Sequence, residues 1–324
     1  MKSISQYREA FTAYLDLKVK VKEPKNLYEP IKYILGLGGK RLRPVLVLMT
    51  TDIFETDYNK ALDAALAIEI FHNFSLVHDD IMDDAPLRRG KETVHERWDI
   101  NTGILSGDAM LINAYQLFEN YSGDTFKELA QLFTKSAIQV CEGQQYDIDF
   151  ETRDDVAIED YLKMIEYKTA VLVGASLQMG AIVANTSTQC KESVYEFGRL
   201  LGIAFQLQDD YLDAFGDPET FGKQVGGDII ENKKTFLYLK SLETSEKNEA
   251  KQLEHLYTIS PEDNSGKIEA VKTIFENSGA AELNKLEIEK YTEKAFEVLE
   301  KIEIDEAKKL PLKQFGELLM NRKV

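Results

Sequence analysis

Two aspartate clusters with the same spacing carry the clearest chemistry in the sequence. They are Asp79-Asp80-Ile81-Met82-Asp83 and Asp209-Asp210-Tyr211-Leu212-Asp213, each at the end of an apolar run. Residues four apart share one helix face, so each cluster places like charges side by side. The clusters also end their helices, where the helix dipole disfavours anions. A bound cation would offset both the repulsion between the carboxylates and the unfavourable helix dipole. Hard carboxylate oxygens favour Mg²⁺, which takes one or two carboxylates together with substrate phosphates.

Chance is the competing explanation for one such cluster, because the chain holds 56 Asp and Glu residues. Two clusters of the same spacing, both at the ends of apolar runs, are far less expected by chance and favour a metal site.

Basic residues beside glycines accompany both clusters. Arginine offers a fork that matches phosphate oxygens and lysine offers a point charge, while glycine lets the backbone approach a ligand closely. Together with a metal, these groups would match the charge of a diphosphate. The four segments are Gly38-Gly39-Lys40-Arg41-Leu42-Arg43, Leu87-Arg88-Arg89-Gly90-Lys91, Phe221-Gly222-Lys223 and Asn232-Lys233-Lys234.

The elements that must position these residues are expected to be helices. Residues 60–84 are rich in Ala, Leu, Ile and Phe without Gly or Pro, and Pro86 follows as a stop. A second long helix is expected over residues 193–214, with Gly198 and Gly202 inside it to allow close helix packing. No proline occurs from residue 87 to residue 217, and apolar residues recur there at helical spacing. The sequence therefore predicts an all-α protein that forms one domain over residues 1–324.

Composition narrows the class of protein. A net charge of −17 would repel a phosphate backbone and argues against nucleic-acid binding. The two cysteines, Cys141 and Cys190, form no CxxC pair and indicate a reduced intracellular protein. We expect neither a signal peptide nor a membrane span, because no long apolar run occurs. A cytoplasmic location follows from these features.

The order of the motifs resembles the trans-isoprenyl diphosphate synthases, the polyprenyl synthetase family. The similarity extends over nearly the whole chain through GGKRLRP, HDDIMDDAPLRRGKETVH, GQQYD, YKTA, FQLQDDYLDAFGD, FGK and ENKKT. The resemblance implies a bundle of about a dozen helices around a central active-site cavity, and a homodimer. It implies a magnesium-dependent prenyltransferase with three ions per site, which joins isopentenyl diphosphate to an allylic diphosphate.

The resemblance also implies roles for individual residues. Asp79 and Asp83, with Asp80, would hold Mg²⁺ on the allylic diphosphate, and Asp209 would hold a further ion. Asp210 and Asp213 would support Asp209. The allylic diphosphate would be bound by Arg88, Lys168, Lys223 and Lys233, and isopentenyl diphosphate by Lys40, Arg43, His72 and Arg89. The reacting carbons would be contacted by Gln144, Thr169 and Gln206.

Two histidine assignments stay open. His72 precedes Asp79 by seven residues on the same helix face, which suits a phosphate contact but also a satisfied helix histidine. His78 and His95 are expected to be structural or supporting residues.

Chain length should be decided beneath the first cluster, because the growing product must extend along that helix away from Asp79. Ser75, Phe74 and Phe71 precede Asp79 by four, five and eight residues. An aromatic residue five before the cluster, a small one at four and no insertion in the motif resemble geranylgeranyl diphosphate synthases. We therefore expect a C20 product, with a C15 farnesyl or a longer polyprenyl product as the alternatives; core packing is the competing explanation for either Phe.

Three other functions are alternatives for a sequence of this kind. A terpene cyclase would replace the second aspartate cluster and would not need Lys40, Arg43 and Arg89. A non-catalytic subunit of a prenyl synthase should have damaged aspartate clusters. A calcium-binding helical protein lacks support because the sequence has no EF-hand loop. The C-terminal residues 321–324 could close over isopentenyl diphosphate or form a disordered basic tail.

Overall fold

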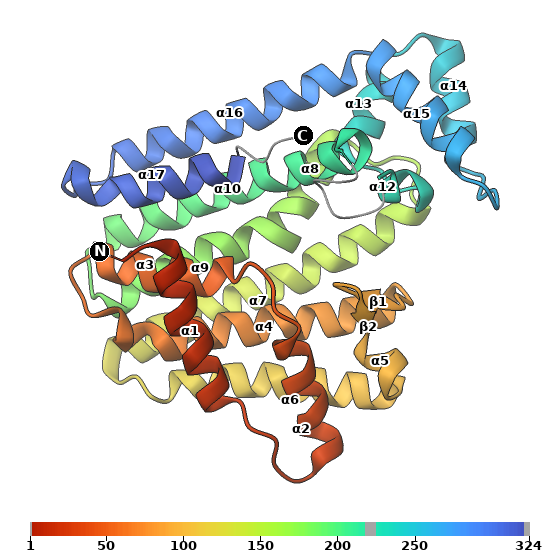
Figure 1. The fold of residues 1–324 in the computed structure, drawn as a ribbon. Coiled ribbons are helices and arrows are strands. Elements are labelled where there is room, and N and C mark those ends of the chain that lie inside the picture. The colour runs from red at the N-terminus through yellow and green to blue at the C-terminus, as the bar shows by residue number, and fades with distance from the viewer. Residues whose placement is uncertain (1, 218–224, 321–324) are drawn as a thin grey trace. The chain divides into compact units, whose positions relative to one another are not determined.

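The protein is built almost entirely of helices, as the sequence predicted (Figure 1). The computed structural model describes residues 2–217 and 225–320. Within these ranges the only strands are β1 (Leu87–Arg88) and β2 (Lys91–Glu92). None of the helices in the described ranges is long and apolar enough to cross a membrane.

Close contacts divide the chain into two compact units. Unit 1 comprises residues 1–134 and 175–192, and unit 2 comprises residues 135–174 and 193–324. The boundary passes within α7, α9 and α10. The expectation of a single domain therefore stays a prediction, and each unit is described by itself below.

Unit 1 contains the helices from the N-terminus to the start of α7. Their bounds are α1 Ile4–Lys18, α2 Lys25–Gly36, α3 Leu42–Ile53, the 3₁₀ turn η1 Tyr58–Ala61, α4 Leu62–Met82, α5 Val94–Arg97, α6 Ile100–Phe118 and α7 Gly123–Thr152, and part of α9 Val171–Val183 joins them.

Unit 2 contains most of the remaining elements. Their bounds are α8 Ile158–Ile165, the π-helix η2 Glu166–Ala170, α10 Thr188–Phe215, α12 Gly227–Ile230, α13 Phe236–Thr244, α14 Lys247–Leu256, α15 Ser265–Asn277, α16 Ala280–Glu300 and α17 Glu306–Met320.

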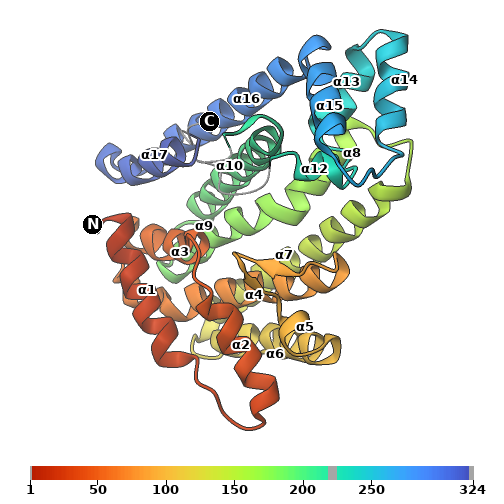
Figure 2. The ribbon, with the colours of Figure 1, turned by 45° about the vertical axis from the view of Figure 1, so that its right-hand side comes forward.

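Helix α4 forms the centre of unit 1. It is buried on nearly every face, which explains why its apolar residues are not confined to one stripe. It packs against α3 and runs beside α6, as both Figure 1 and Figure 2 show. The helix predicted over residues 60–84 is confirmed, except that residues 58–61 form the 3₁₀ turn and α4 ends at Met82.

The strands β1 and β2 form a two-residue hairpin that the sequence did not predict. Arg89 and Gly90 make its turn with φ angles of 54° and 72°. Positive φ at both central residues is the requirement of the type I′ hairpin turn, which glycine meets easily. Each strand is too short to show an alternating pattern. The hairpin and α5 follow directly on the C-terminal end of α4 (Figure 1).

Helix α10 packs tightly against the π-helix of unit 2. A Cβ atom added to Gly202 would lie 2.6 Å from the Cα of Ala170, so the two backbones meet at this glycine. The close packing predicted for Gly202 is therefore confirmed. Behind α10, buried side chains of α13, α14 and α15 complete an apolar core, including Leu237, Leu253 and Val271.

Candidate active site

The first aspartate cluster ends helix α4. Asp79 is half-buried, whereas Asp83 is exposed and caps the helix. The backbone N–H of Asp83 donates to the carbonyl oxygen of Asp79 at 2.9 Å. This last helical turn keeps the two side chains on one face, as the spacing predicted.

Asp80, between them, has a different setting. It is 1% exposed, and the Nε of Arg88 donates to both of its carboxylate oxygens at 2.8 Å. Burial raises the pKa of the Asp80 carboxyl, and the guanidinium of Arg88 opposes that shift. The sequence assigned a metal to Asp80 and a diphosphate to Arg88. The structure pairs the two with each other, which positions Arg88 from the end of α4.

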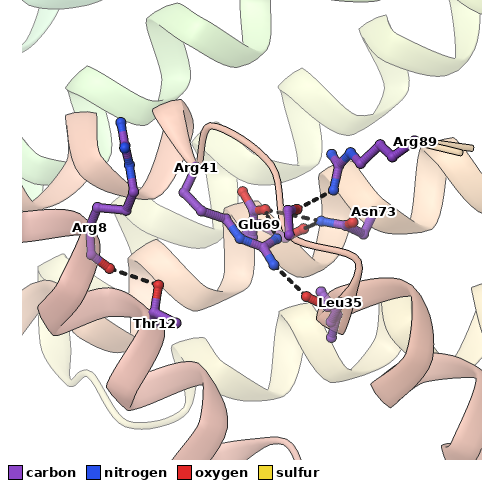
Figure 3. A network of polar contacts seen from close by, with 8 residues as sticks. Arg8, Thr12, Leu35, Arg41, Glu69, Asn73 and Arg89 are labelled. Carbon is purple, nitrogen blue, oxygen red and sulfur yellow. Dashed lines mark hydrogen bonds and ion pairs between the residues drawn. The ribbon is translucent and has the colours of Figure 1, made fainter. Parts of the chain in front are cut away.

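A network around Glu69 fixes the turn that precedes α3. Arg41 has a left-handed backbone, with φ of 50°, and its buried guanidinium donates to Glu69 and to the carbonyl oxygen of Leu35. The same Glu69 oxygen accepts from the Nδ2 of Asn73 at 3.2 Å. Figure 3 shows Arg41 and Asn73 converging on Glu69. Arg41 is therefore neutralised, which distinguishes it from Arg43 two residues later.

Arg43 and His72 form a positively charged centre. Burial lowers the pKa of Arg43 to about 10, although Glu69 opposes that shift. The buried Nε of Arg43 has no hydrogen-bond partner among the described residues. Burial also lowers the pKa of His72 well below its ordinary value, and the charges of Arg43 and Arg89 add to that shift. A neutral imidazole near a guanidinium whose Nε is unsatisfied is suited to an anion.

Arg89 reaches the same centre across the turn before α3. Its guanidinium donates to the carbonyl oxygen of Gly38, and Figure 3 shows it extending toward the Glu69 network. A Cβ on Gly39 would lie 2.8 Å from the guanidinium carbon of Arg89, and Gly39 has φ of 118°. Only glycine fits there without strain. Lys40, the fourth residue predicted for this anion site, is exposed beside the turn.

The second aspartate cluster is built on α10 in unit 2. Asp210 is 7% exposed. One of its carboxylate oxygens accepts from the hydroxyl of Tyr161, and the other accepts from the Nε2 of Gln206 at 2.8 Å. Burial raises the pKa of Asp210 to about 7, and the neighbouring carboxylates of Asp209 and Asp213 act in the same direction.

Asp228 adds a carboxyl that the sequence analysis missed. It is the second residue of α12, and its backbone N–H donates to the Oδ2 of Asp213 at 2.9 Å. Burial raises its pKa to about 8, with Asp210 and Asp213 contributing further. Its position after Gly226-Gly227 was the available sequence signal. Several carboxylates gather in this group, so the donor set fits a divalent cation with oxygen ligands.

The π-helix η2 presents two predicted residues to this group. The Nζ of Lys168 donates to the Oδ2 of Asp147 at 2.6 Å. The hydroxyl of Thr169 donates to the Oε1 of Gln206 at 3.1 Å, which continues the chain to Asp210. Short π-helical segments interrupt α-helices at functional sites in many proteins. Gly143 permits this one, since a Cβ there would lie 2.3 Å from the backbone nitrogen of Lys168.

These side chains line one cavity of about 110 Å³. It brings together five residues that the sequence assigned to the site and several that it did not. Gln144, Asp209 and Asp213 were predicted for the same site but are not part of the lining. The five are Lys168, Thr169, Gln206, Asp210 and Lys233, and the additional ones include Phe150, Tyr161 and Asp228.

Lys233 supplies positive charge to the cavity. Burial would lower its pKa, but the hydrogen bond to Glu231 and the charge of Asp228 raise it overall. The next residue, Lys234, instead donates to the carbonyl oxygen of Arg153. Of the adjacent pair, Lys233 thus has the more suitable setting for a ligand. Lys223 and residues 321–324, which the sequence also singled out, lie outside the described residues.

The residues predicted to set product length lie on α4 in unit 1. Phe71 and Phe74 are buried, with ring centroids 5.5 Å apart, and Ser75 is half-buried. Phe71 also packs edge-on against Phe133 at 5.1 Å, within an aromatic cluster that continues to Phe118. Phe74 lies one turn nearer Asp79. Core packing therefore accounts for Phe71 more fully than for Phe74.

The raised pKa values predict that cation binding to unit 2 depends on pH. Metal ligands must lose their protons, so Mg²⁺ should release protons from Asp210 and Asp228. The apparent affinity should rise between pH 6 and pH 8, by up to about tenfold per pH unit for each proton released. Titration calorimetry in buffers of different ionisation enthalpy measures both quantities.

The variant Asp228→Asn tests whether these carboxyls cause the pH dependence. It removes one titrating group and one negative charge, which should lower the pKa of Asp210 and move the pH dependence to more acidic values. Asp155→Asn, at an exposed carboxylate, should leave the profile unchanged. Equal affinity at pH 6 and pH 8 in the unaltered protein would contradict the prediction.

Comparison with known proteins agrees with this arrangement. The family model described as polyprenyl synthetase matches residues 24–275. A short chain isoprenyl diphosphate synthase of Methanothermobacter thermautotrophicus is 38% identical, over 80% of this chain and 79% of its own. A geranylfarnesyl diphosphate synthase of Natronomonas pharaonis is 34% identical, over 86% of this chain and 85% of its own.

A solved structure is more similar still. The crystal structure of a geranylgeranyl pyrophosphate synthase is 53% identical in sequence, with a TM-score of 0.96 over 100% of both chains. The family match extends over most of the sequence and includes both aspartate clusters. This chain belongs to the polyprenyl synthetase family.

Proposed function

We propose that the protein joins isopentenyl diphosphate to an allylic diphosphate and releases geranylgeranyl diphosphate. The observation that carries this proposal is the positive centre of Arg43, His72 and Arg89. It supplies an anion site in addition to the acidic clusters. Chain elongation needs two diphosphate sites, whereas a cyclase needs one.

The metal-binding part of the proposal assigns Mg²⁺ to the acidic clusters. Asp79 and Asp83 would hold ions on the allylic diphosphate, and Asp209, with Asp210 and Asp213, would hold another, for three in all. Bound Mg²⁺ supplies positive charge to the departing diphosphate. Metal analysis of the protein with a non-reactive allylic analogue should count these ions.

The protein's own residues then have separate tasks. Arg88, Lys168 and Lys233 carry positive charge to the same diphosphate as its C–O bond breaks. The oxygens of Thr169 and Gln206 lie beside the cavity where an allylic cation would be stabilised. The alkene of isopentenyl diphosphate attacks that cation to form the new C–C bond. The released diphosphate accepts the proton that is lost, so the reaction requires no histidine or glutamate base.

The proposal also covers the chain length of the product. Phe74, the residue directly before Ser75, has the size and burial to stop the growing chain. The similarity to a geranylgeranyl pyrophosphate synthase at 53% identity supports C20. The similarity to a geranylfarnesyl synthase makes C25 the second candidate, ahead of the C15 product.

The activity itself has a direct test. Purified protein with Mg²⁺, labelled isopentenyl diphosphate and each allylic starter from C5 to C15 should yield mainly a C20 diphosphate. Omitting isopentenyl diphosphate should leave the starter unchanged. A cyclic hydrocarbon formed from the starter alone would instead identify a cyclase, and no product in either reaction would favour a non-catalytic subunit.

Replacing Phe74 should lengthen the product. In Phe74→Ala the lost ring opens space along α4, so products of C25 and longer should appear beside C20. Phe118→Ala is the matched control, because it removes a buried ring of the same unit farther along the aromatic cluster. An unchanged product distribution in Phe74→Ala, or equal lengthening in the control, removes Phe74 from this role.

A homodimer is the expected assembly, and α6 offers a surface for it. Leu105 and Ile112 are each 60% exposed, and Ile104 is 40% exposed, so one helix presents several apolar side chains to solvent. Contiguous exposed apolar surface marks interaction sites. Leu105→Glu combined with Ile112→Glu should yield monomers by light scattering. Leu318→Glu, at a leucine of α17 that is 64% exposed, should leave the dimer intact; dimers in both variants would exclude α6.

A cytoplasmic location completes the proposal. Cys141 and Cys190 are both unpaired, which suits a reducing compartment. Cell fractionation tests it, and recovery of the protein from the membrane fraction would contradict it.

A further inference from the structure

Three potential metal ligands meet where α4 gives way to the hairpin and α5. They are the carboxylates of Asp84 and Glu96 and the imidazole of His95. One ligand atom from each lies within 4.8 Å of the other two. None of the three belongs to the proposed diphosphate or magnesium sites. The group therefore needs an explanation of its own.

His95 is the unusual member of the group. It is 7% exposed, yet neither ring nitrogen has a hydrogen-bond partner within the described ranges. Its Nε2 lies 3.7 Å from the Oε1 of Glu96, which is beyond hydrogen-bond distance. A buried imidazole without a partner is destabilising, and buried polar groups in native proteins are nearly always satisfied. The nearby carboxylate oxygens indicate what could satisfy it.

Asp84 and Glu96 can adapt to an ion. Both are exposed, with the side chain of Glu96 49% exposed, so small rotations can bring their oxygens closer to the imidazole. The backbone around them is held in place. The N–H of Ala85 donates to the carbonyl oxygen of Asp80 at 2.9 Å, and the N–H of Thr93 donates to that of Pro86 at 3.1 Å. The ligands thus project from a fixed frame.

We propose that Asp84, His95 and Glu96 bind a divalent ion of the zinc class, with water in the fourth position. One nitrogen and two carboxylate oxygens suit Zn²⁺, which prefers four tetrahedral ligands. Bond lengths of about 2.0–2.2 Å place such ligands about 3.4 Å apart, which modest side-chain rotation can reach. Mg²⁺ prefers oxygen ligands in an octahedron, so it is a poor match for the imidazole.

The ion would fasten the base of the basic hairpin. Asp84 precedes β1, and His95 and Glu96 follow β2, so one ion joins the two ends of the segment that carries Arg88 and Arg89. Arg88 is already held at its side chain by Asp80. The ion would add a second attachment through the backbone. This proposal does not rest on the proposed enzymatic activity.

Metal binding in excess Mg²⁺ tests the site. Protein stripped of metal and returned to millimolar Mg²⁺ is titrated with Zn²⁺, and the fluorescence of Trp98, the single tryptophan, reports binding two residues from Glu96. We expect one Zn²⁺ per chain that Mg²⁺ does not displace. Asp84→Asn and Glu96→Gln should each weaken Zn²⁺ binding at least about tenfold. Loss of a residue that only hydrogen-bonds to a metal ligand already lowers metal affinity by about that factor, and these two variants alter the ligands themselves. Diffraction at the zinc absorption edge should place the ion among the three side chains.

The control and the contrary outcomes are distinct. Glu92→Gln alters an exposed carboxylate of the same hairpin that is outside the group, and its Zn²⁺ affinity should not change. Both ligand variants alter exposed side chains, so they should fold normally, as circular dichroism can verify. The proposal is overturned if no Zn²⁺ binds, if Mg²⁺ displaces it fully, or if both ligand variants bind Zn²⁺ like the unaltered protein. Product formation is measured separately, so loss of one property does not imply loss of the other.

Discussion

Unbalanced buried charge is the constraint on which the site depends. In unit 2, burial and neighbouring carboxylates raise the pKa of Asp210 to about 7 and the pKa of Asp228 to about 8. In unit 1 the opposite excess surrounds His72, where the half-buried Arg43 has a buried and unsatisfied Nε. Desolvated charges of one sign are destabilising unless a partner arrives. One excess fits a cation and the other fits an anion, which are the components of a metal–diphosphate reaction.

Several basic residues near the proposed site are paired with groups of the protein itself. This pairing leaves other basic residues as the ones whose setting suits a ligand. Arg41 is neutralised by Glu69, and Arg88 by Asp80. Lys234 is tied to a backbone carbonyl oxygen, while Lys233 lines the cavity. In the pairs Arg41 with Arg43 and Lys234 with Lys233, the first residue fixes the local backbone and the second has a setting that suits a ligand. Arg88 is instead oriented by its ion pair with Asp80. Such pairing holds the site rigid before any ligand binds, which is what electrostatic preorganisation requires.

The backbone departs from regular geometry where these charges must be presented. The π-helix at residues 166–170 presents Lys168 and Thr169 to the cavity, and Gly143 gives it the necessary space. The type I′ turn at Arg89-Gly90 and the left-handed Arg41 orient the basic residues of unit 1. The regular parts of the helices supply the apolar core instead. Phe71 illustrates the division, because the rings around it explain its burial without any role in product length.

The sequence alone determined the helical class and the family, and it supplied most residues of the proposed site. Helical spacing and motif order are local properties of the chain, so α4, α10 and the two aspartate clusters could be predicted from them. Tertiary structure alone decided which charges are neutralised. That Asp80 holds Arg88, that Asp228 joins Asp213, and that Asp84 meets His95 all depend on contacts across turns or between elements, which spacing does not encode. Burial decided the direction of the pKa shifts. The pKa of a carboxyl or an imidazole depends on how much water the group loses when the helices pack, and that depends on the tertiary structure.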